Sequence, residues 1–201
     1  MCVSYFNNTM SDEPSETPTT VPIEHDAAIG RVARSWGHLE HMVDVILWDA
    51  AGVPHQIGAC ITSQFGSIHP KLKALGALLL LLGVNPAIRK KVETFQAKLY
   101  DIGDRRARTV HDARLQNSSG DVVRWQTTAS SKEIVFGPQP ESIEELVKLR
   151  QRIARNIARF EAIKKEIRDE LLRLQASRQK QPLQLLQIVE NPRTQDHKPN
   201  T

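Results

Sequence analysis

The chain has 201 residues, 40% of them hydrophobic, which is enough for one globular domain with its own core and too few for two domains of ordinary size. Lysine and arginine number 27 against 23 acidic residues, a net charge of +4 that permits a polyanionic partner without requiring one. Two cysteines without a CxxC motif argue against a disulfide-stapled secreted fold.

Two observations predict a cytoplasmic protein without a membrane partner. The most apolar run, from Leu72 to Val84, contains Lys73 and is shorter than the roughly 20 residues that a membrane-spanning helix needs. No lysine or arginine precedes Arg31, so the N-terminal region lacks the basic start of a signal peptide.

Composition predicts tails at both ends of a single domain. Residues 1–21 are rich in Ser, Thr, Pro and acidic residues and cannot bury enough apolar surface to offset the entropy of ordering. Residues 177–201 follow the last helical pattern and are also predicted to be disordered. The domain is therefore expected to cover residues 22–176.

The first half of this domain is predicted to form three helices. Apolar residues from Ile29 to Ile46 recur every three or four positions, which predicts one long amphipathic helix over residues 23–51. A short helix is expected over residues 56–64. A third helix is expected from Pro70 to Gly83, and its run of leucines predicts that it is covered on most sides and anchors the core.

A fourth helix is predicted to start at Asn85 and Pro86, an N-cap followed by a suitable first residue. Its apolar stripe consists of Ile88, Val92, Phe95, Leu99 and Ile102. When the same spacing is continued, the next positions of the stripe are Arg106, Thr109 and Ala113. An arginine therefore occupies a position where the pattern calls for an apolar side chain.

The next segment, QNSSGD, is a turn signal, and two β-rich runs after it predict a hairpin over about residues 121–136, which Gly137, Pro138 and Pro140 should end. Trp125, beside Arg124, has two interpretations: it can stack on a nucleic acid base or pin the hairpin to the core. A last long helix is expected over residues 141–176. The predicted fold class is all-α, a bundle of about five helices with a small β-hairpin before the last.

The segment from Asp104 to Leu115, DRRARTVHDARL, carries the motif of greatest interest. It resembles the motif of the HEPN family (higher eukaryotes and prokaryotes nucleotide-binding), small all-helical proteins of which many are RNases. That motif is an arginine, usually followed by Asn, Asp or His, with a histidine four to six positions later, near the end of a long helix. Arg106 and His111 match it, whereas Ala107 departs from it. The order of elements over residues 23–176 is also similar to that family.

The resemblance implies a metal-independent endoribonuclease of the toxin or phage-defence type, with a composite active site between the two copies of a homodimer. His111 would then take part in proton transfer at the ribose 2′-hydroxyl, and Arg106 would stabilise charge on the scissile phosphate. Arg105, Arg108 and the acidic Glu40 are implied as RNA-binding residues, with a cognate antitoxin protein as a further partner.

Helix geometry adds a reason to expect two copies. Arg106 and His111 lie about 140° apart around an ideal helix, so one helix cannot aim both side chains at one phosphate. A two-fold axis would bring two pairs into one cleft. Contact is expected through the faces of the long helices.

Other interpretations stay open. The arginines can instead complement the dipole at the helix C-terminus, and the protein can be a catalytically inactive HEPN-like dimerisation or RNA/nucleotide-binding module. His38 and His41 lie one turn apart, but they lie off the apolar stripe and outside any HExxH motif, so a solvated flank is the favoured interpretation. No metal and no cofactor are predicted.

Overall fold

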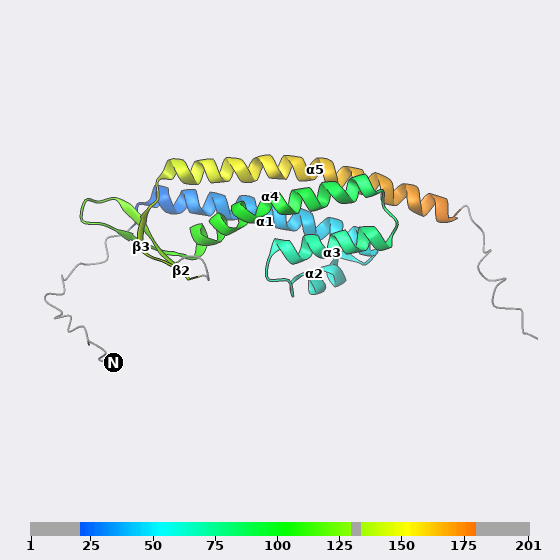
Figure 1. Ribbon diagram of the computed structural model, residues 1–201, viewed down its shortest axis with the longest axis horizontal. Coiled ribbons are helices and arrows are strands. Elements are labelled where there is room, and N and C mark those ends of the chain that lie inside the picture. Colours follow the sequence, from blue (N-terminus) through cyan, green and yellow to red (C-terminus); the bar gives the residue numbers. More distant parts are fainter. Residues whose placement is uncertain (1–20, 130–133, 180–201) are drawn as a thin grey trace, which may run out of the picture. The chain divides into compact units, whose positions relative to one another are not determined.

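The computed structural model describes residues 21–129 and 134–179. These residues form five helices and one three-stranded antiparallel sheet that precedes the last helix, which confirms the predicted mainly helical fold with a β insertion (Figure 1). The elements are α1 (Ile23–Ala51), α2 (His55–Thr62), α3 (Ile68–Leu81), α4 (Pro86–His111), β1 (Ala113–Gln116), β2 (Val122–Ala129), β3 (Ile134–Pro140) and α5 (Ile143–Gln179). The predicted tails lie outside the described residues, except for Val21 and the end of α5.

The chain divides into two compact units, and α1, α4 and α5 each contribute to both. The sheet unit contains the described residues up to Ser35 and the described residues from Ile102 to Arg152. The helical unit contains Trp36–Asp101 and the described residues from Ile153 onward. The predicted domain, residues 22–176, spans both units. Among the described helices, none has both the length and the apolar composition to cross a membrane.

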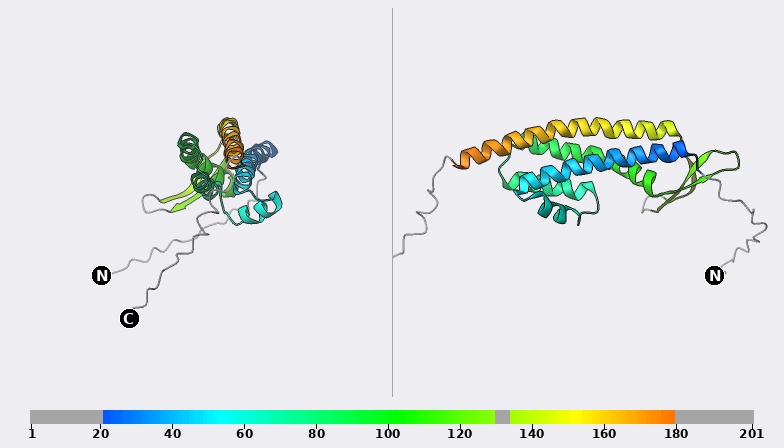
Figure 2. Two further views of the ribbon diagram at one scale, coloured as in Figure 1. Left: turned by 90° about the vertical axis from the view of Figure 1, so that its right-hand side faces the viewer. Right: turned by 180° about the vertical axis from the view of Figure 1, so that it is seen from behind.

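The helical unit has a core of aliphatic and aromatic side chains from α1, α3, α4 and α5. Phe95 of α4 stacks on Phe160 of α5 with ring centroids 4.9 Å apart. The short helices α2 and α3 lie beside the second half of α1 (Figure 2). The Trp48 Nε1 of α1 donates to the Thr62 Oγ1 of α2 over 3.2 Å. The fully buried residues of this core include Leu39, Val43, Ile46, Ile68, Leu75, Leu79, Leu99, Ile153 and Ile167.

The predicted boundary between the third and fourth helices is confirmed in atomic detail. Gly83 has a φ of 76°, its N–H donates to the Leu80 carbonyl over 3.1 Å, and the Val84 N–H donates to the Leu79 carbonyl over 3.0 Å. This pair of bonds is a Schellman motif, which requires the left-handed conformation that glycine adopts without strain. The Asn85 side chain then caps α4 by accepting from the Ala87 N–H over 2.8 Å.

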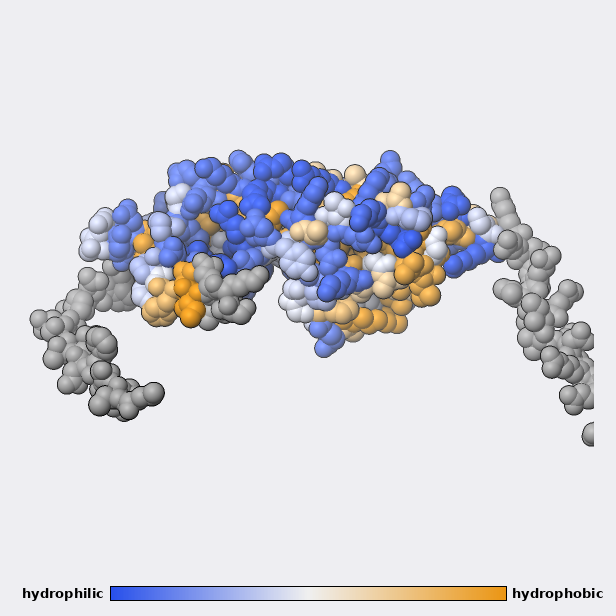
Figure 3. Space-filling view, in the orientation of Figure 1, coloured by the Kyte–Doolittle hydropathy of each residue, from blue (hydrophilic) through white to orange (hydrophobic). Residues whose placement is uncertain are grey.

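The prediction that the leucine-rich helix is covered on most sides is wrong for the described chain. One face of α3 is buried, but Leu80 and Leu81 on its other side are 61% and 79% exposed. Figure 3 shows hydrophobic surface along α2 and α3. The helix behaves as an amphipathic surface helix because only its i, i+3, i+4 face (Ile68, Leu72, Leu75 and Leu79) meets the core.

The predicted two-stranded hairpin is a three-stranded sheet in the order β1-β2-β3. The additional strand, β1, begins at Ala113, so the prediction that Ala113 continues the helical stripe is wrong. The predicted turn joins β1 to β2: the Gly120 N–H donates to the Asn117 carbonyl over 2.9 Å, with a φ of 84° at Gly120. The prediction that Gly137 and the two prolines end the hairpin is also wrong. They lie within β3, an edge strand, where proline is tolerated.

The two faces of this sheet differ in polarity. Along β1, exposed Ala113 and Leu115 alternate with the half-buried Arg114 and Gln116. Phe136 of β3 is 72% exposed. The sheet therefore turns polar and charged side chains inward and leaves apolar side chains on its outer face, the reverse of the usual arrangement for an antiparallel sheet.

Candidate functional site

The motif residues occupy the last two turns of α4, within the sheet unit. Arg105 is exposed, Arg106 is half-buried and Arg108 is half-buried. The guanidinium Nη2 of Arg108 lies 3.0 Å from the Asp104 Oδ2, one turn earlier. His111 is the last residue of the helix and is exposed. The structure thus gathers four of the five predicted site residues on one short helical segment.

Arg106 and His111 lie on a regular α-helix, which fixes how their side chains diverge. Five residues correspond to a rise of about 7.5 Å and a net rotation of about 140°. Their side chains leave the helix in different directions, so a single copy does not aim both at one reacting atom.

Arg114 supplies hydrogen-bond donors to carbonyl groups at the C-terminal end of α4. The Arg114 Nη1 donates to the Asp112 carbonyl over 3.1 Å, and its Nη2 donates to the Thr109 carbonyl. A cationic side chain at this end also complements the helix dipole. Arg114, the last of the four arginines between Asp104 and Leu115, thus fills the capping role that was considered for these arginines.

The buried carboxylate of Glu141 joins three segments of the sheet unit. Its side chain is only 8% exposed. The Glu141 Oε2 lies 2.9 Å from the Arg114 Nε and 3.4 Å from the His25 Nε2, and its Oε1 lies 3.6 Å from the Arg124 Nε. This residue therefore links the start of α1, both strands of the first hairpin and the segment that precedes α5.

A second ion pair holds the chain directly after the motif histidine. The Arg124 Nη1 lies 2.8 Å from the Asp112 Oδ2, and Arg124 also donates to the Gln126 Oε1 over 3.1 Å. Because Asp112 follows His111, this pair fixes the backbone at the end of the motif. The sequence signal for this polar sheet face is that polar residues recur at every second position, Arg114 with Gln116 and Arg124 with Gln126.

Trp125 contacts the neighbouring strand. Its ring meets that of Phe136 edge to face, with centroids 5.4 Å apart and planes at 88°. The two residues are diagonal neighbours, since Trp125 is paired with Pro138 and Phe136 with Thr127. This contact lies within the sheet and involves an exposed partner, so both interpretations of Trp125 remain predictions.

The remaining candidates lie on α1 in the helical unit. Glu40 is half-buried, and His38 and His41 are exposed. The His41 ring meets the Trp48 ring edge to face, with centroids 6.1 Å apart.

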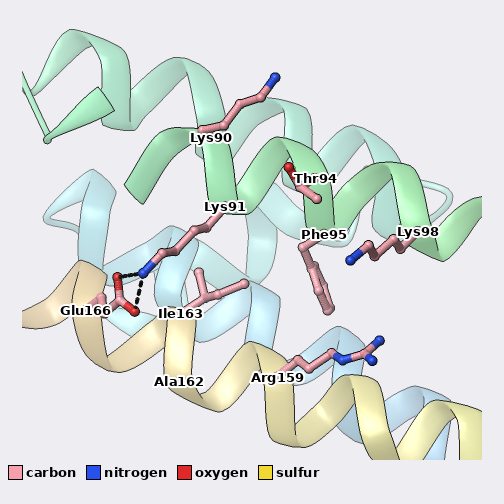
Figure 4. A pocket seen from close by; sticks show the side chains of 9 residues that line it. All are labelled: Lys90, Lys91, Thr94, Phe95, Lys98, Arg159, Ala162, Ile163 and Glu166. Carbon is pink, nitrogen blue, oxygen red and sulfur yellow. Dashed lines mark hydrogen bonds and ion pairs between the residues drawn. The ribbon is translucent and has the colours of Figure 1, made fainter. Parts of the chain in front are cut away.

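A groove that sequence reasoning missed lies between α4 and α5 in the helical unit and encloses about 400 Å³ (Figure 4). At one end, the Lys91 Nζ lies 2.6 Å from the Glu166 Oε2. At the other end, Lys98 and Arg159 reach past the ring of Phe95. The groove lies between two segments that are distant in sequence, so no local motif could have revealed it. Its full lining is Lys90, Lys91, Thr94, Phe95, Lys98, Arg159, Ala162, Ile163 and Glu166.

Comparison with known proteins gave no match to this chain among protein families, curated proteins or solved structures.

Proposed function

We propose that the protein is a metal-independent endoribonuclease of the HEPN type whose active site forms between two copies of the chain. The observation that carries this proposal is the exposed His111 at the very end of α4, five residues after the half-buried Arg106. Histidine can accept and return a proton near neutral pH, and arginine can hold a phosphate through two parallel hydrogen bonds.

The chemistry needs only the RNA and these side chains. The ribose 2′-oxygen attacks the adjacent phosphorus, and the bond from phosphorus to the 5′-oxygen breaks. The products are a 2′,3′-cyclic phosphate and a 5′-hydroxyl end. His111 would move the proton between the attacking and leaving oxygens, and Arg106 would stabilise the additional negative charge on the phosphate. Exposed Arg105 would contact the RNA backbone.

Two features support a homodimer. Arg106 and His111 diverge on one helix, so a second copy related by a two-fold axis would supply the complementary member of each pair. The apolar outer face of the sheet follows directly after the motif, with Leu115 50% and Phe136 72% exposed, and a protein partner could cover it. A dimer should appear in light scattering of the purified protein, and its dissociation should abolish cleavage.

The decisive experiment is cleavage of mixed RNAs by purified protein in EDTA. We expect new 5′-hydroxyl ends with the wild type, none with His111→Ala or Arg106→Ala, and no cleavage of RNA in which the 2′-hydroxyl is replaced by hydrogen. His38→Ala is the matched control because it removes another exposed histidine, and it should cleave normally. Intact RNA with high concentrations of wild-type protein would overturn the proposal.

One observation favours a second candidate, a catalytically inactive dimerisation or RNA/nucleotide-binding module: Ala107 replaces the polar residue that usually follows the motif arginine. The two candidates differ in living cells. Induced expression of a toxin-type RNase should arrest growth, and His111→Ala should relieve the arrest. Equal growth with both forms would favour the module. A cognate antitoxin that binds and inhibits the protein is expected only if the protein is a toxin-type RNase.

A further inference from the structure

Two cations, Lys98 and Arg159, lie at one end of the groove between α4 and α5. Neither residue forms an ion pair with a described residue, and Figure 4 shows both side chains directed to the same end of the groove, beside Phe95. Two positive charges at the same end of a groove favour an anion between them, because each cation attracts it. An arginine beside a lysine is also a suitable pair for one carboxylate or phosphate group.

The other charges of the groove are already neutralised. Lys91 is paired with Glu166, and the Lys90 Nζ lies 3.3 Å from the Glu93 Oε2. Available positive charge is therefore confined to one end and does not continue along the groove. A polyanion such as RNA is better matched by a continuous row of unpaired cations, so this distribution favours a ligand with a single anionic head.

The wall between the two ends is mainly apolar. Phe95, Ala162 and Ile163 line it, with Phe95 itself 3% exposed. Arg159 and Glu166 are seven residues apart on α5, a rise of about 10 Å. A volume of about 400 Å³ lies in the range of small-molecule sites. The groove therefore has room for an apolar body roughly the length of two fused aromatic rings.

We propose that this groove binds a small organic anion, with its anionic head between Lys98 and Arg159 and its apolar body against Phe95, Ala162 and Ile163. The proposed binding site lies in the helical unit, and the proposal is independent of the proposed ribonuclease activity.

The experiment is titration of the full chain with 2-naphthoate, which carries one carboxylate on a two-ring body. Binding is followed by calorimetry and by the NMR signal of the Ile163 methyl groups. We expect saturable binding at millimolar or lower concentration and a shift of the Ile163 signal. Lys98→Glu and Arg159→Glu should each weaken binding by about tenfold or more, because each removes a charged contact.

Lys165→Glu is the matched control, since it makes the same charge change at an exposed position of α5 outside the groove, and it should bind as the wild type does. Neutral 2-naphthamide should bind at least about tenfold more weakly than 2-naphthoate. All variants change exposed side chains, and circular dichroism checks that they fold.

Three results would overturn the proposal. The first is no saturable binding of 2-naphthoate. The second is equal binding of 2-naphthamide, which would mean that the cations hold no head group. The third is an Ile163 shift with a single-stranded RNA oligonucleotide and none with 2-naphthoate, which would identify a polyanion surface. 2-Naphthyl phosphate in place of 2-naphthoate establishes whether a phosphate or a carboxylate head is preferred.

Discussion

Arg114 and Arg124 are paired directly opposite each other on β1 and β2, and both guanidinium groups approach the carboxylate of Glu141. Like charges at directly opposed positions destabilise a sheet. Here the buried Glu141 and the partly buried Asp112 balance the two positive charges, so the polar inner face of the sheet depends on these acids.

We therefore expect Glu141→Gln to lower the free energy of unfolding by about 3–5 kcal/mol, because it removes the counter-charge of Arg114 and leaves Arg124 with Asp112 alone, while keeping the side chain's size. Urea unfolding followed by circular dichroism measures the change. Glu144→Gln, three residues later at an exposed position, should alter stability by less than about 0.5 kcal/mol. Similar stabilities for the two variants would show that the ion pairs around Glu141 contribute little.

Two glycines in helices should respond to alanine in opposite directions. A Cβ at Gly58 would lie 2.4 Å from the Cγ of Trp48, a side chain held in place by its hydrogen bond to Thr62. Gly58→Ala should therefore cost about 1–3 kcal/mol of stability. A Cβ at Gly37 of α1 would meet no neighbouring atom within 4 Å, and Gly37→Ala should stabilise the protein by up to about 1 kcal/mol. Thermal unfolding of both variants checks the two signs, and a stabilised Gly58→Ala would contradict the close contact.

The helices could be predicted because their signals are local. The bounds of α1 follow from its apolar spacing and from Gly52, whose φ of 66° ends the helix. Gly83 and Asn85 mark the next boundary in the same way. Such signals depend on residues within one or two turns, so tertiary contacts do not override them.

The sheet was predicted only in part because its strands depend on pairing. Strand β1 has four residues, two of them polar, and becomes a strand through its register with β2. The prolines of β3 were expected to end the strand. Proline is tolerated there because β3 is an edge strand, and the position of a strand within a sheet is not visible in the sequence.

The same distinction between local signals and tertiary contacts applies to the residues of the candidate site. Arg106 and His111 could be selected from one short segment, whereas Glu141 acquires its role only when folding brings it beside Arg114 and Arg124. The convergence of Lys98 and Arg159 likewise requires two helices to pack. Sequence therefore identifies residues with suitable chemistry, and the packed structure identifies which of them share an environment.

The N-terminus of α5 should lose stability when its capping box is broken. The Glu145 N–H donates to the Ser142 Oγ over 3.2 Å, and the Ser142 N–H donates to the Glu145 Oε2 over 3.4 Å. These bonds satisfy two helix-end donors. Ser142→Ala should cost about 1 kcal/mol in chemical unfolding, whereas Ser142→Asp, which also caps, should cost less. Equal losses of stability in Ser142→Ala and Ser142→Asp would show that capping by a side-chain oxygen at this position does not stabilise the helix.

The stability of the protein should depend on His69 as the pH falls. Burial, reinforced by the positive charge of Lys73, lowers the pKa of His69 below its usual 6.5. Its ring stacks on Tyr100, with centroids 4.0 Å apart. The unfolded chain therefore takes up a proton on this residue at a higher pH than the folded chain does. Above the unfolded pKa both states are neutral and nothing is lost; as the pH falls through that value toward the folded pKa, stability decreases.

We expect His69→Phe, which keeps a ring for Tyr100 and cannot titrate, to lose less stability than the wild type between about pH 7.5 and about pH 5.5. Urea unfolding across this range measures the difference. His38→Phe, which makes the same substitution at an exposed histidine, is the matched control and should retain the wild-type slope. If His69→Phe and the wild type lose stability in parallel, a different group governs the acid sensitivity, and the stacked ring of His69 is protonated as readily in the folded chain as in the unfolded one.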